Sequence, residues 1–219
     1  MVFSRLLTLL LHTKFTIMRT FYIALALGLA FLSSCGNSQP ADSNAGATAA
    51  APAAPKAPMQ SMLKEADSKL LMSTLATYYT LKNAMVATNA EGIKTAATQL
   101  GAIADSLNKT LAQNYGADDS LKAYDGMKPF LDTLLTETKN IIGLEDPKCE
   151  RQRLSFGPLS SAMYGLLRKV ELKNAGVYHE FCPMAFNDKG AYWLSEESEI
   201  KNPYFGKKMM ECGEVTDSL

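Results

Sequence analysis

Four stretches of the sequence repeat apolar residues at steps of three and four, the spacing that an amphipathic α-helix requires. Polar breaks separate the stretches, and Asn89, followed by Glu91 in the first turn, has the chemistry of a helix N-cap. Helices joined by short connections favour an up-down antiparallel bundle. We therefore expect a mostly α fold whose four-helix bundle uses the segments 59–86, 89–111, 120–142 and 146–173.

Residues 18–35 have the parts of a bacterial secretory signal: Arg19 comes first, an apolar core follows, and small residues precede Cys35. The last four residues resemble a lipobox, in which the cysteine is lipidated and begins the mature chain. We therefore expect a lipoprotein signal peptide over residues 1–35, with Met18 as an alternative start, and a lipid-anchored protein of the cell envelope. A cleaved signal with an incidental cysteine and an uncleaved anchor are the alternatives, although the apolar core is short for a membrane span.

Residues 36–58 are rich in alanine and proline and nearly free of large apolar side chains, so they bury too little surface to become ordered. We interpret them as a disordered tether for a single domain, residues 59–219, that faces the periplasm or the cell surface. Three of the 22 basic residues and none of the 22 acidic ones precede the expected mature start, which leaves 19 basic residues against 22 acidic ones. This balance argues against nucleic acid as a partner.

Residues 177–215 concentrate soft metal ligands among aromatic side chains. Thiolate and thioether sulfurs, with imidazole as a partner, select Cu(I) or zinc over hard cations. No Cys-x-x-Cys pair or zinc-finger spacing is present. Gly190 and the polar residues before it are typical of a turn, which would fold residues 178–184 back on residues 191–195 as a hairpin-like cap. The candidate metal ligands expected to meet across this cap are His179, Cys182, Met184, Met209, Met210 and Cys212.

The run CPMAFNDKGAYWLSEESEIKNPYFGKKMMECGEV, residues 182–215, resembles the end of a bacterial domain family of unknown function. That family is found in lipoproteins and attached to periplasmic adaptors of copper/silver-type heavy-metal efflux systems. Residues 78–100 and 153–167 resemble its helical part. The resemblance implies a helical bundle with an appended motif and an association with copper or silver handling. We therefore expect a membrane-tethered protein that binds Cu(I) or Ag(I) as an accessory of metal efflux or homeostasis, with efflux components as partners.

The cysteines leave a second interpretation open. In an oxidising compartment Cys182 and Cys212 would form a structural disulfide as readily as a metal site, which would make the chain an interaction module without metal. Cys149 is the remaining thiol, and it lies near the start of a helix whose dipole would lower a thiol pKa. No serine or cysteine has a second histidine or a patterned acid to activate it. The sequence therefore favours a binding protein over an enzyme, with a thiol oxidoreductase as the enzymatic alternative.

Overall fold

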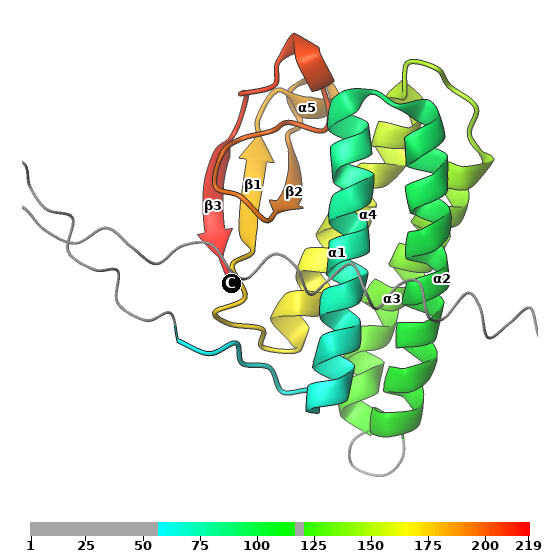
Figure 1. Cartoon of the computed structure of the whole chain (residues 1–219), viewed down its shortest axis with the longest axis vertical. Helices are drawn as coiled ribbons and strands as arrows, with labels where there is room; N and C mark the ends of the chain where they lie inside the picture. The colour runs from blue at the N-terminus through cyan, green and yellow to red at the C-terminus, as the bar shows by residue number, and fades with distance from the viewer. Residues whose placement is uncertain (1–56, 117–120) are drawn as a thin grey trace, which may run out of the picture. The chain divides into compact units, whose positions relative to one another are not determined.

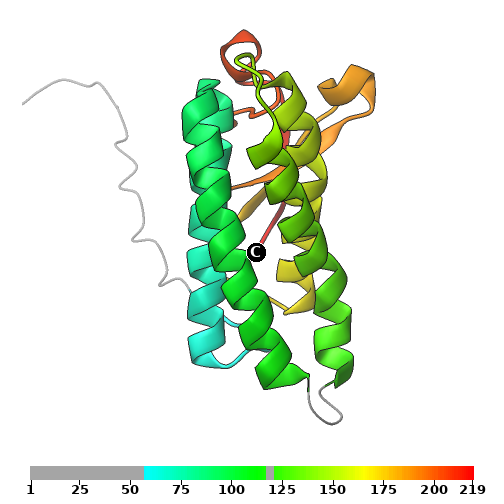
Figure 2. The ribbon, with the colours of Figure 1, turned by 90° about the vertical axis from the view of Figure 1, so that its right-hand side faces the viewer.

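The computed structural model describes residues 57–116 and 121–219. The expected signal peptide, Cys35 and nearly all of the expected tether lie outside these residues. Each long helix packs along its length against the next one in the chain, and consecutive helices run in opposite directions (Figures 1 and 2). The predicted four-helix bundle is confirmed. Its helices are α1 (Glu65–Ala87), α2 (Ala90–Tyr115), α3 (Leu121–Gly143) and α4 (Glu150–Lys169).

The start of α2 agrees with the sequence prediction. Asn89 caps α2 as predicted, because its side chain accepts a hydrogen bond from the backbone N–H of Gly92 at 3.0 Å. None of the helices among the described residues combines the length and apolar character that a membrane crossing requires.

The start of α4 differs from the prediction. The helix begins at Glu150 and not at Asp146, where the predicted segment starts. The Asp146 carboxylate accepts bonds from the backbone N–H groups of Lys148 and Arg151, at 3.0 and 2.9 Å, and so closes a turn before the helix. Cys149 follows with a left-handed φ of 61°. Its thiol is buried, and burial raises its pKa, so the expected lowering by the helix dipole is wrong.

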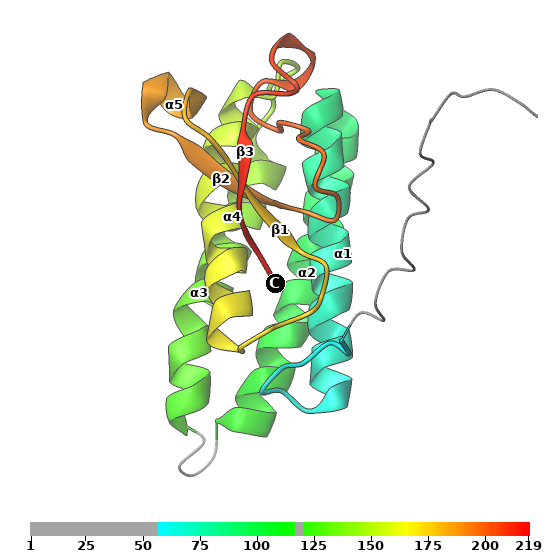
Figure 3. The same ribbon diagram turned by 90° about the vertical axis from the view of Figure 1, so that its left-hand side faces the viewer.

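The C-terminal part of the chain is a three-stranded antiparallel sheet with the strand order β2-β1-β3 (Figures 1 and 3). Its elements are β1 (Tyr178–Cys182), the short turn α5 (Ala185–Asp188), β2 (Ala191–Ser195), the 3-10 turn η2 (Gly206–Lys208) and β3 (Glu214–Ser218). The pairing of β1 with β2 confirms the predicted hairpin, and Gly190 supplies its turn with a φ of 77°. The hairpin-like cap is nevertheless an incomplete description, because β3 adds a third strand.

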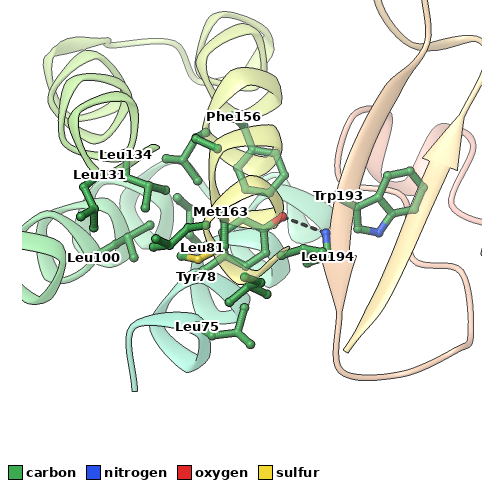
Figure 4. Packing of buried hydrophobic residues seen from close by; sticks show 14 of the residues in the cluster. Leu75, Tyr78, Leu81, Leu100, Leu131, Leu134, Phe156, Met163, Trp193 and Leu194 are labelled. Atoms are coloured by element: carbon green, nitrogen blue, oxygen red, sulfur yellow. Dashed lines mark hydrogen bonds between the residues drawn. The ribbon is translucent and has the colours of Figure 1, made fainter. Parts of the chain in front are cut away.

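The sheet packs on the bundle through β2, which lies against α4 (Figure 3). Leu194 points into the bundle, whereas its neighbour Trp193 points away from it (Figure 4). Both side chains are fully buried, because the chain that follows β2 covers the far face of the sheet. The buried residues of the bundle around this contact include Leu75, Leu81, Leu100, Leu131, Leu134, Phe156 and Met163.

Tyr78 of α1 connects the sheet to two helices. Its hydroxyl oxygen accepts a hydrogen bond from the backbone N–H of Leu194 in β2 at 3.0 Å (Figure 4). The same hydroxyl lies 2.8 Å from the Ser160 hydroxyl of α4, and the Tyr78 ring stacks on Phe156 at 5.5 Å. Because Tyr78 is fully buried, all of these polar groups depend on one another for their partners.

We expect Tyr78→Phe to lower the free energy of unfolding by about 1–3 kcal/mol, because the Leu194 N–H and the Ser160 hydroxyl lose a partner away from water. Urea unfolding followed by circular dichroism measures the loss. The matched control is Tyr124→Phe, which removes a half-buried 2.8 Å bond to Asn108 and should cost less than about 1 kcal/mol. Equal losses in the two variants would contradict this role of Tyr78.

Candidate functional site

Strand alternation divides the predicted ligands between the two faces of β1. Successive side chains of a strand point to opposite faces, so His179 and Cys182, three residues apart, lie on different sides. The His179 ring is stacked between Tyr164 and Tyr192, with ring centroids 3.7 and 4.6 Å away. Its Nδ1 lies 3.1 Å from Thr216 Oγ1, and burial lowers its pKa. His179 therefore braces the sheet against α4 and does not join the cysteines.

Cys182 and Cys212 do come together. Their sulfur atoms lie 2.9 Å apart although 30 residues separate them in the chain, and both are free thiols. Cys182 is fully buried in β1, the middle strand, whereas Cys212 is only half-buried in the turn that follows η2. The hydrogen bond to Cys182 and burial raise the pKa of the Cys212 thiol to about 11. At neutral pH the Cys212 thiol therefore keeps its proton until a metal ion displaces it or an oxidant removes it.

Asn202 positions the turn that carries Cys212, a role that was not predicted from the sequence. Its side-chain amide donates to the Cys212 carbonyl at 2.7 Å, and its backbone N–H donates to the Met210 carbonyl at 2.8 Å. The Cys212 N–H closes the turn on the Met209 carbonyl at 3.2 Å. Asn202 is fully buried, so these bonds are shielded from water. Asn202 therefore holds the turn that carries Cys212 next to Cys182.

Met184 and Met209 line a second feature, a surface pocket of about 580 Å³ beside the start of α4. Met184 is 46% exposed, so its thioether is open to solvent. Met210 is half-buried and does not line this pocket. The other lining residues are Glu150, Arg151, Arg153, Leu154, Phe186, Asn187, Asp188, Tyr204 and Phe205.

Three consecutive lining residues of this pocket have a strained backbone conformation. Phe186, Asn187 and Asp188 have left-handed φ values of 55°, 57° and 63°, which cost residues other than glycine about 1–2 kcal/mol each. Packing stabilises the turn, because the Phe186 ring meets the Tyr204 ring edge-on at 5.1 Å and lies over Gly157. A Cβ at Gly157 would come within 2.9 Å of the Phe186 ring. The turn after Met184 is therefore stabilised by packing against Tyr204 and against Gly157 of α4.

A buried group of charges lies on the same face of β1 as Cys182. Glu180 is fully buried, and within the described residues neither of its carboxylate oxygens has a hydrogen-bond partner. Lys82, only 2% exposed, reaches from α1 to Glu196 at 2.9 Å and to the Ser195 hydroxyl at 3.2 Å. Burial raises the pKa of Glu180 to about 7, although the nearby Lys82 ammonium opposes this shift. Glu180 is thus a buried acid whose pKa lies near neutral pH.

The six predicted ligands therefore fall into separate places: one cysteine pair, one methionine-lined pocket, a half-buried Met210 and a histidine on the opposite face. Across residues 57–116 and 121–219, no three His, Cys, Asp or Glu side chains converge as a metal-binding group. A site at the cysteines would consequently rest on two thiolates, and any further ligand would be a thioether. Cu(I) and Ag(I) suit such a soft donor set, whereas a tetrahedral zinc site would lack ligands.

A protein family matches part of the chain. Residues 74–175 match the family described as "Protein of unknown function (DUF3347)". The matched region runs from within α1 to just before β1, so the cysteine pair and the methionine-lined pocket owe most of their residues to the chain beyond it. Comparison with curated proteins and with solved structures gave no match.

We expect Glu180→Gln to stabilise the protein at alkaline pH. The native state holds the Glu180 proton more tightly than the unfolded chain does, so this carboxyl lowers stability progressively as pH rises from about 4.5 to 7. The glutamine variant should therefore gain nothing at pH 4 and about 3 kcal/mol at pH 8. Chemical unfolding across this pH range measures the difference.

The matched control is Glu199→Gln, because the Glu199 side chain is 76% exposed. Its stability relative to wild type should change little with pH. A constant offset between Glu180→Gln and wild type at every pH would contradict the role of Glu180 ionisation.

Proposed function

We propose that the protein is an exported, membrane-tethered lipoprotein that binds Cu(I) or Ag(I) through Cys182 and Cys212, as an accessory of metal efflux or homeostasis. The observation that carries the proposal is the 2.9 Å separation of two free sulfurs from distant parts of the chain. Soft monovalent ions need few ligands, and thiolates are the ligands they prefer. No catalytic step is part of this function.

The geometry supports a two-thiolate site whose opening requires a small movement. Metal–thiolate bonds of about 2.3 Å would hold two sulfurs on one ion roughly 4 Å apart, so the pair must separate by about 1 Å. Cys212 lies in a half-buried turn and can move outward, whereas Cys182 is fixed in the middle strand. Met209 belongs to the same turn, so its thioether moves with Cys212 and can supply an additional soft ligand.

The cellular role rests on the sequence. The signal-like residues 18–35 support export and a lipid anchor at Cys35 in the cell envelope. The resemblance of residues 182–215 to domains attached to copper/silver efflux adaptors supports components of such a system as partners. The family matched by residues 74–175 has no known function and adds nothing to this point.

A second candidate function is a disulfide-stapled interaction module. It is favoured by the same sulfur distance, because a disulfide of about 2.05 Å needs less than about 1 Å of closure. In an oxidising compartment such a cross-link would persist and would exclude metal.

Titration of the reduced protein with Cu(I) or Ag(I), in competition with a chromophoric chelator, tests the metal function. We expect one ion per chain, with affinity falling by more than about a hundredfold in Cys182→Ser and in Cys212→Ser. Cys149→Ser is the matched control and should bind as wild type does. Because metal ions displace thiol protons, wild-type affinity should rise steeply between pH 6 and pH 8. Oxidation to the disulfide should abolish binding.

One outcome would overturn the metal function in favour of the alternative. The reduced wild type would then bind metal no better than the double cysteine variant. That variant would lose thermal stability only in comparison with oxidised wild type. The chain would in that case use the cysteine pair as a structural cross-link.

Membrane attachment gives a separate prediction. We expect Cys35→Ala to release the protein into the soluble fraction, or to leave the signal peptide uncleaved, because the thiol that carries the lipid is lost. Fractionation of expressing cells, with mass spectrometry of the N-terminus, measures both effects. Unchanged fractionation together with unchanged processing would count against lipidation.

A further inference from the structure

The strand β3 has an open side. It is the outer strand of the sheet, paired on one side with β1, while the opposite end of the sheet, β2, packs against α4 (Figures 1 and 3). Within the part of the chain that the structure describes, no strand pairs with the other side of β3. An uncovered strand edge presents backbone N–H and C=O groups that another extended segment can pair with.

The pairing pattern identifies the backbone groups that face outward. Leu219 and Val177 exchange two backbone hydrogen bonds, at 2.8 and 3.1 Å, so Leu219 faces β1. Because bonding direction alternates along an antiparallel strand, Asp217 also faces β1, and Ser218 faces the open side. The register skips Thr216 in a bulge, and the Thr216 hydroxyl donates to the His179 carbonyl of β1 at 2.9 Å. The side chains of Thr216 and Ser218 are exposed, and Val215 is 41% exposed.

The charge on this edge is negative. Glu214 begins the strand, the exposed Glu211 precedes it, and Asp217 lies within it. The hydrogen bond from Tyr164 and the Arg168 guanidinium, 3.4 Å away, both lower the pKa of Asp217, so its carboxylate stays ionised. A second copy would bring a second acidic edge against this one, which like-charge repulsion disfavours. A five-residue strand edge also falls well short of the roughly 1,200 Å² that a stable dimer buries.

We propose that β3 is a docking edge for an extended, basic segment of a partner protein, which pairs antiparallel or parallel with Glu214–Ser218 as a fourth strand. Backbone bonds to Ser218 supply the pairing, and lysine or arginine side chains meet Glu214 and Asp217. The pairing itself uses neither cysteine, so the interaction needs no metal.

The probe is a blocked, fluorescein-labelled hexapeptide of alternating lysine and valine, titrated into the purified protein and followed by anisotropy. We expect saturable binding that Glu214→Lys weakens by about fivefold or more, because one attractive pair becomes repulsive. The charge-matched control, Glu65→Lys, changes a side chain that is 83% exposed on α1 and should leave binding unaltered. A peptide with a central proline should bind more weakly because it lacks a backbone donor.

Amide hydrogen exchange locates the contact independently of the variants. Bound peptide should protect the N–H group of Ser218, whereas those of α2 should exchange as before. Equal binding of a glutamate–valine peptide, protection only outside β3, or displacement of the peptide by self-association of the protein would each overturn the proposal.

Discussion

The hydrogen bond from the Leu194 N–H to the Tyr78 hydroxyl sets the register on which the C-terminal sheet depends. A slip of β2 by one residue would leave this N–H unpaired in the interior and would exchange the faces of Leu194 and Trp193. β2 is paired residue by residue with β1, so the same bond fixes where Cys182 stands. The geometry of the cysteine pair therefore depends on the contact between Tyr78 of α1 and Leu194 of β2.

The helices were predictable because each is specified by nearby residues. Apolar periodicity marked all four, Asn89 marked a cap, and Gly190 marked the hairpin turn. Cys149 was misjudged because its burial depends on how α4 packs, which no local rule contains. β3 was missed for a related reason: its sequence, Glu-Val-Thr-Asp-Ser, has no alternating apolar pattern, since most of its side chains face solvent. Its strand conformation comes from pairing with β1.

The candidate site was predicted in part. The pairing of two sulfur clusters across a hairpin anticipated the contact between Cys182 and Cys212. The sequence could also have shown that His179 does not join Cys182, because residues three apart in a strand have side chains on opposite faces. The roles of Asn202 and Glu180 could not be predicted from the sequence, because they depend on burial and on contacts between residues far apart in the chain. Sequence chemistry names candidate ligands, but only the packed sheet decides which of them meet.

The two proposed states of the cysteine pair demand opposite movements of one turn. Cys182 is paired with Ala191 of β2 and is fully buried, so Cys212 must approach for a disulfide or retreat for a metal ion. Asn202 makes two hydrogen bonds to the backbone of that turn, so these bonds set the free-energy cost of both movements. Retreat also requires the thiols to lose their protons, which the raised pKa of Cys212 opposes. Metal binding at this pair therefore depends on an ion soft enough to displace protons from thiols, as Cu(I) and Ag(I) are, and on a compartment or donor that keeps the pair reduced until the ion arrives.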